Sequence, residues 1–68
     1  MQRQPVSSSN ISSIWYEEWI LEIEFHSWWI YQYSEVPVEE YNNLMNASSI
    51  GSYFAHNIKE KYVCTQVG

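Results

Sequence analysis

Hydrophobic and polar residues alternate strictly over residues 21–26, where the sequence reads LEIEFH. A period of two is typical of a β-strand with one buried face and one solvated face. A second alternation, YQY, follows at residues 31–33, and residues 27–29 separate the two runs. The pattern therefore predicts a β-hairpin with strands at about 20–26 and 30–33.

The faces of the two strands fix the register that we expect for this hairpin. If Phe25 pairs with Tyr31, Ile23 faces Tyr33, and all four side chains share the inward face. That register requires a three-residue loop at 27–29, Ser-Trp-Trp. Such loops favour one residue with a positive φ, where Gly is at ease and Trp is strained. We therefore expect a longer loop, backbone strain or contacts from outside the domain at this position.

A further strand precedes the hairpin, and a helical pattern follows it. Apolar residues set among serines predict a strand over about residues 11–16, followed by a turn at Glu17 and Glu18. Pro37 suits the first turn of a helix, where its missing N–H does no harm. Apolar residues then recur at helical spacing, at Val38, Tyr41, Leu44 and Met45.

A second helix is predicted from Phe54, Ile58 and Tyr62, which lie four residues apart and form a buried stripe. Either Ser49 or Ser52 supplies its N-cap. The chain is thus predicted to be α+β, in the order β-β-β-α-α. We expect a three-stranded antiparallel sheet followed by two short helices packed on one face.

Length and composition place this fold in one small domain. We expect residues 1–9 to form a flexible N-terminal arm, residues 10–63 the single domain, and residues 64–68 a C-terminal tail. A domain of this length buries only roughly 60% of its unfolded surface. The single cysteine, Cys64, excludes an internal disulfide, so stability should come from dense aromatic packing or self-association. The aromatic content of 18% fits both routes.

The net charge of the chain limits the classes of molecule that it is expected to bind. The net charge is −5, from eight glutamates against Arg3, Lys59 and Lys61. This balance argues against broad binding of nucleic acid or anionic membranes, and it leaves the three cations as candidate phosphate contacts of a small local site. Residues 1–14 lack a secretory signal, and no stretch approaches the roughly 20 apolar residues of a membrane span. We therefore expect a cytoplasmic protein without membrane contact.

Few residues of the chain could support catalysis or bind a metal. His26 and His56 are the only histidines, and no metal-ligand spacing connects them with Cys64. Glu22 and Glu24 share one strand face, where paired carboxylates can perform acid–base chemistry, but a solvated outer face explains them more simply. We expect a non-enzymatic protein with no catalytic residue, metal or cofactor.

Five aromatic residues form the candidate contact surface: Trp19, Trp28, Trp29, Tyr31 and Tyr33. Tyrosines on a sheet can stack on bases, although alternating positions more often place them in the core. A tryptophan pair at the tip of a hairpin has little of its own domain to pack against, and exposed aromatic clusters mark contact sites. We expect this pair to contact another copy or another protein; folding back on the sheet and binding a ligand are the alternatives.

Five tracts of the sequence match one family in order: PVSSSNISSI at 5–14, LEIEF at 21–25, YQY at 31–33, VP at 36–37 and ASSIGSYFAHNIKEKY at 47–62. Together they resemble the KTSC domain, a small module named for the C-terminus of some lysyl-tRNA synthetases. It also occurs as a stand-alone bacterial or phage protein. The biochemical role of the family is not established, and its link to synthetases implies association with RNA or tRNA.

The sequence departs from the family pattern where it carries tryptophan. The family tends to place Gly before the tyrosine that corresponds to Tyr16, and Gly in the hairpin loop; here those places hold Trp15 and the pair at 28–29. The segment after Tyr16 is also shorter than usual and contains Trp19. The first interpretation is accordingly a KTSC-type binding module associated with RNA or tRNA. A protein-interaction or self-associating module that uses the tryptophan-rich hairpin and the sheet edge is the alternative.

Overall fold

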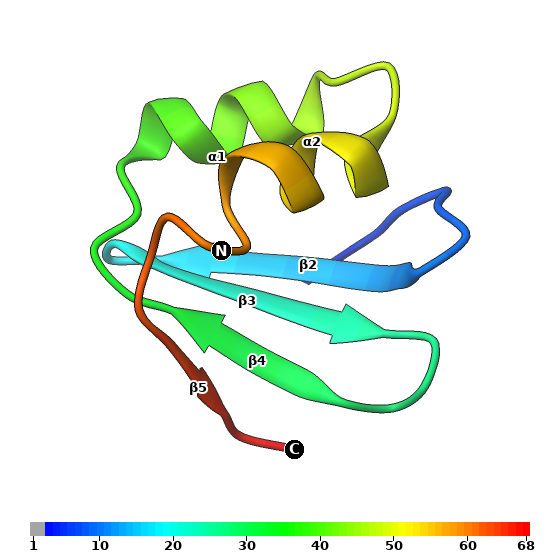
Figure 1. Ribbon diagram of the computed structural model, residues 1–68, viewed down its shortest axis with the longest axis horizontal. Helices are drawn as coiled ribbons and strands as arrows, with labels where there is room; N and C mark the ends of the chain where they lie inside the picture. The colour runs from blue at the N-terminus through cyan, green and yellow to red at the C-terminus, as the bar shows by residue number, and fades with distance from the viewer. Residues whose placement is uncertain (1–2) are drawn as a thin grey trace.

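The structure is a computed structural model and describes residues 3–68. Its sheet is antiparallel, with strands in chain order: β1 (Gln4–Pro5), β2 (Ile11–Glu17), β3 (Ile20–Phe25), β4 (Ile30–Tyr33) and β5 (Cys64–Gln66). Two helices, α1 (Val38–Met45) and α2 (Ile50–Asn57), connect β4 to β5. Both helices cover the same face of the sheet and leave the other face open (Figure 1). No helix within the described part of the chain is long and apolar enough to cross a membrane.

The α+β class and the two helices on one face are confirmed, but the prediction of three strands is wrong. Two short edge strands complete the sheet: β1 pairs with β2, and β5 pairs with β4. The first lies in the predicted flexible arm and the second in the predicted tail. Strands of two and three residues are too short to show a period, and Pro5 suits an edge strand because it lacks an N–H.

The predicted hairpin forms, but its register differs by two residues. Tyr31 pairs with Ile23, and Tyr33 pairs with Leu21. The loop has the predicted three residues but occupies 26–28, because the Phe25 N–H donates to the Trp29 carbonyl at 2.9 Å. A shift of two residues leaves every side chain on its predicted face, so alternation alone cannot detect it.

The turn between β2 and β3 also lies one residue later than expected. Glu17 pairs with Ile20, so Glu18 and Trp19 form a two-residue loop. Their φ angles are 52° and 71°, as a type I′ turn requires. Asn-Gly is the common choice for this turn, and this chain places two side chains with a Cβ there.

The core lies between the inner face of the sheet and the helices. Its fully buried side chains include Ile14, Leu21 and Ile23 from the sheet, and Leu44 from α1. The first helix forms where it was predicted, but Pro37 is its N-cap, with extended backbone, rather than a residue of its first turn.

The second helix differs from its prediction at its end. Ser49 caps α2, since its Oγ accepts the Ser52 N–H at 3.3 Å. α2 ends at Asn57, so Ile58 and Tyr62 of the predicted stripe follow the helix rather than belong to it. Ile58 is nevertheless fully buried.

Candidate functional site

A pocket of about 470 Å³ opens between the loop of the β3–β4 hairpin and α2. Its apolar walls are Phe25 of β3, Trp29 just before β4, Tyr31 of β4 and Phe54 of α2. The centroid of the Phe25 ring lies 5.9 Å from that of Tyr31 and 5.7 Å from that of Phe54, both in edge-on geometry. The aromatic walls therefore support one another and hold the shape of the pocket.

Tyr31 and Tyr33 have different roles at this pocket. Tyr31 is half-buried and lines the wall. Tyr33 is buried at the floor, with its ring centroid 5.4 Å from that of Phe54. Burial, with smaller contributions from Cys64 and Tyr31, raises the pKa of the Tyr33 phenol to about 12, so it stays protonated. Of the two predicted tyrosines, only Tyr31 presents a ring to a ligand.

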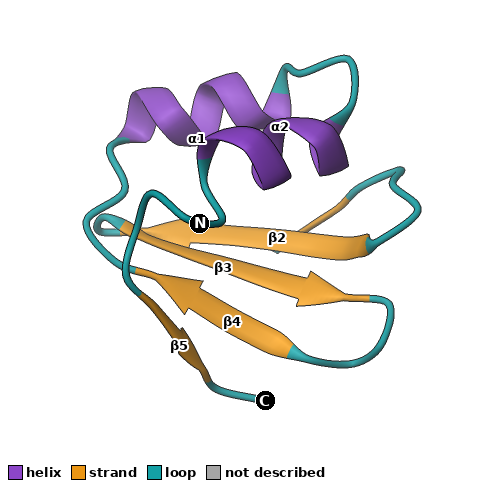
Figure 2. Cartoon of the chain, viewed as in Figure 1, coloured by secondary structure: helices purple, strands orange, loops and turns teal. Residues whose placement is uncertain are grey.

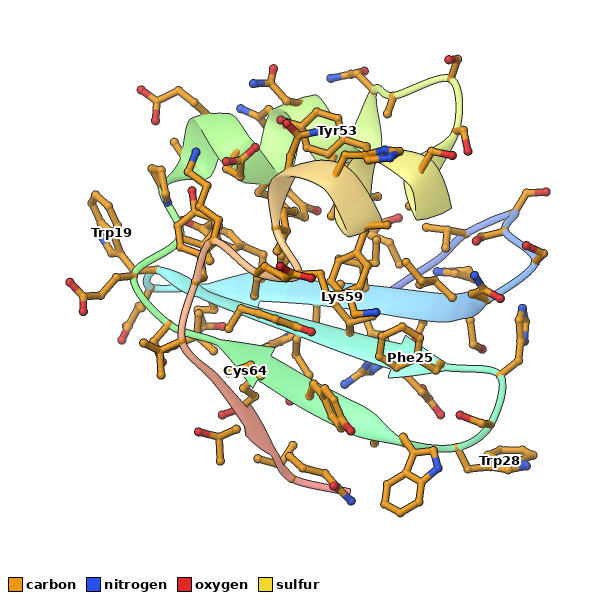
Figure 3. The ribbon with its side chains drawn as sticks, viewed as in Figure 1. Trp19, Phe25, Trp28, Tyr53, Lys59 and Cys64 are labelled. Atoms are coloured by element: carbon orange, nitrogen blue, oxygen red, sulfur yellow. The ribbon has the colours of Figure 1, made fainter. Side chains whose placement is uncertain are left out.

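The rim of the pocket carries its polar groups. Lys59 follows α2 in a turn and is exposed, and both Lys59 and Phe25 line the pocket (Figure 3). His26 lies in the hairpin loop, where its Nε2–H donates to the Ser8 carbonyl at 3.0 Å. None of the residues that line this pocket is acidic.

The three cations proposed as phosphate contacts do not form one patch. Arg3 lies on the open face of the sheet, where it makes ion pairs with Glu22 and, at 3.7 Å, with Glu24. Lys61 pairs with Glu40 at 3.2 Å. Lys59 is the one cation among residues 3–68 for which the structure contains no ion pair. The one arginine and two glutamates of this cluster have a net charge of −1, so the cluster is not a basic surface.

The tryptophans of the candidate contact surface lie at two opposite ends of the sheet. Trp28 and Trp29 flank the end of the β3–β4 loop, and their side chains are 81% and 51% exposed. Trp19 is 59% exposed in the β2–β3 turn. β3 runs between the two turns, and Figures 2 and 3 show them at opposite sides of the molecule. Trp19 therefore does not share a surface with the pair.

The structure also contains a second polar cluster, formed around Glu40, which was not predicted from the sequence. Glu40 lies on α1 and is 7% exposed. It accepts hydrogen bonds from the phenols of Tyr53 and, at 2.8 Å, Tyr62. Burial would raise the pKa of the Glu40 carboxyl, but the hydrogen bonds from both phenols and from Lys61, with the charge of Lys61, outweigh it and lower that pKa. Its position four residues before Leu44, on the same helix face, was the available signal.

The Glu40 cluster ties the two helical segments together. Tyr53 belongs to α2, and Tyr62 and Lys61 follow it. Hydrogen bonding to Glu40, the burial of the ring and the negative charge of Glu40 raise the pKa of Tyr53. An ionised carboxylate with its oxygens occupied by three donors is a structural anchor rather than a proton acceptor.

The cysteine and the two histidines, which were considered as catalytic or metal-binding residues, lie at separate places in the structure. Cys64 is exposed on the edge strand β5. His26 lines the aromatic pocket, whereas His56 lies on α2 beside a different, serine-rich depression. Within residues 3–68, no three His, Cys, Asp or Glu side chains are grouped as metal ligands.

A family model and a solved structure that are similar to this chain both point to the same family. The sequence model of the KTSC domain matches residues 7–62. An uncharacterized protein from Stutzerimonas stutzeri (strain A1501) is 38% identical over 64 residues, covering 91% of this chain and 90% of the relative. The crystal structure of a KTSC domain protein from Yersinia pestis is 46% identical and superposes with a TM-score of 0.94, covering 98% of this chain and 97% of that one.

Proposed function

This chain belongs to the KTSC domain family, and we propose that it is a non-enzymatic interaction module that associates with a second copy of itself through the end of the β3–β4 hairpin. The observation that carries this proposal is the exposed Trp28 in a loop that has no carboxylate, whereas the similarly exposed Trp19 directly follows two glutamates. The φ of Trp28 is 76°, and its indole is 81% exposed. A glycine would fit this backbone without strain, and the indole contributes little to the core of its own domain.

Charge favours this surface for contact between two copies. Each copy has a net charge of −5, so two copies repel one another over most of their surface. The hairpin loop at 26–28 and Trp29 carry no carboxylate. Two copies that meet at this end bring indoles together and keep their glutamates apart.

RNA binding is the second candidate, and Lys59 is the observation that favours it. Its free ammonium group lies at a pocket whose walls, Phe25 and Tyr31, could stack on a base. Arg3 and Lys61 are already paired with carboxylates, so few cations remain for phosphates. A site with one phosphate contact gives a slope of only about −0.7 in log affinity against log salt for single-stranded RNA. A slope several times steeper would refute this arrangement.

Sedimentation equilibrium tests the self-association. The average mass of the wild-type protein should rise above 8.1 kDa as its concentration increases. The Trp28→Gly variant should remain a monomer. The matched control is Trp19→Gly, which removes an exposed indole from a positive φ of 71° at the opposite end of the sheet; it should associate as the wild type does.

Two outcomes would contradict the proposal. A wild-type protein that stays monomeric up to about 1 mM has no association stronger than roughly −4 kcal/mol. Equal association of the wild type and the Trp28→Gly variant would show that the contact lies elsewhere.

A further inference from the structure

The aromatic pocket has a charge pattern that differs from the rest of the protein. The chain has eight glutamates, and none of them lines the pocket. Its rim holds Lys59, the cation for which residues 3–68 contain no ion pair. A local positive charge in an acidic protein, beside apolar walls, is complementary to a ligand that combines an anion with an apolar body.

We propose that this pocket binds a small carboxylate with an aromatic or branched aliphatic body. The apolar body packs against Phe25, Tyr31 and Trp29, and the carboxylate pairs with the Lys59 ammonium group. The volume of about 470 Å³ lies within the range of pockets that enclose small molecules. The site goes beyond the proposed self-association: it shares Trp29 with that contact, but Trp28 is not among its walls.

The single cation distinguishes a carboxylate from a phosphate. Sites for phosphate present several donors, such as an arginine fork or a row of backbone N–H groups. Here the Ser49 Oγ already accepts the Ser52 N–H of the first turn of α2, and the Nε2–H of His26 is directed to the Ser8 carbonyl. The other polar lining residues, Ser9, Asn10 and Ser27, carry no charge. One ammonium group therefore matches the single charge of a carboxylate better than the charge of about −1.5 to −2 of a phosphate monoester.

The binding test uses three ligands that share a phenyl ring: 3-phenylpropionate, its neutral amide 3-phenylpropionamide, and phenyl phosphate. Titrations followed by ¹H–¹⁵N NMR should shift the amide signals around Phe25, Tyr31 and Lys59. The carboxylate should bind about threefold more tightly than the amide, as expected for an exposed ion pair. Lys59→Gln should abolish that preference, and Lys59→Arg should keep it. Lys59 is exposed, so both variants should fold.

Two further proteins, the Ala55→Leu and Trp28→Gly variants, test whether the ligand binds in this pocket and whether its binding is independent of self-association. Ala55→Leu adds an apolar side chain to the helix wall of the pocket and should weaken binding of both the carboxylate and the amide. Titration of Trp28→Gly separates this site from self-association, because that variant retains every wall of the pocket. Equal affinity for the carboxylate and the amide, an unchanged preference in Lys59→Gln, or tighter binding of phenyl phosphate would each overturn the inference.

Discussion

The strain at Trp28 can be measured by a comparison of Gly and Ala variants. A residue with a Cβ in the left-handed region costs roughly 1–2 kcal/mol relative to the usual backbone, and the φ of Trp28 is 76°. Trp28→Gly and Trp28→Ala both remove the indole, so the difference between them does not depend on what the indole contacts. We expect the Gly variant to be more stable than the Ala variant by about 1 kcal/mol.

Ser27, the preceding loop residue, supplies the matched control. Its φ is not positive, so Gly there gains no relief and loses more conformational entropy on folding. Ser27→Gly should therefore be less stable than Ser27→Ala by about 0.5 kcal/mol. The difference in unfolding free energy between the Gly and Ala variants should therefore have opposite signs at positions 27 and 28.

Urea unfolding followed by far-UV circular dichroism measures these free energies. In thermal unfolding, a difference of 1 kcal/mol corresponds to about 4–8 °C for a domain of this size. If the Ala variant at position 28 equals or exceeds the Gly variant in stability, the turn does not hold a positive φ. The loop would then not occupy residues 26–28, and Trp28 would not be a strained contact residue.

Three further predictions concern the polar contacts of the fold. Glu40→Gln should lower the unfolding free energy by about 2 kcal/mol in urea titrations, because it removes a charged acceptor shared by three donors; a change below the error of the fit would refute the anchor role. Because folding lowers the pKa of Glu40, the advantage of the wild type should be full above the ordinary value of 4.5 and shrink as the pH falls through the lowered pKa; an advantage that grows in acid would reverse the sign. Tyr16→Phe should cost about 1–3 kcal/mol because it leaves the buried Val36 carbonyl without the phenol that donates to it at 2.6 Å; differential scanning calorimetry that shows an unchanged Tm would contradict this.

The candidate site was predictable only in part. Trp29, Tyr31 and Lys59 were identified from residue type, and the structure places them on one pocket. The separation of Arg3 from this pocket was not predictable, because the face on which Arg3 lies depends on its contacts with Glu22 and Glu24. The Glu40 cluster was invisible for a similar reason: its phenols come from residues 13 and 22 positions further along the chain.

The pattern of apolar and polar residues was sufficient to predict the α+β class and the buried face of the two hairpin strands. Alternation over LEIEFH and the helical spacing of the apolar residues from Val38 to Met45 are local properties, because they follow from the direction of consecutive side chains. Tertiary structure alone decided the hairpin register, the two edge strands and the pairing of Arg3 and Lys61 with carboxylates. A register shift of two residues preserves the pattern of faces, and a short edge strand has no pattern of its own. The hairpin register and the edge strands therefore depend on contacts between residues that are distant in the sequence.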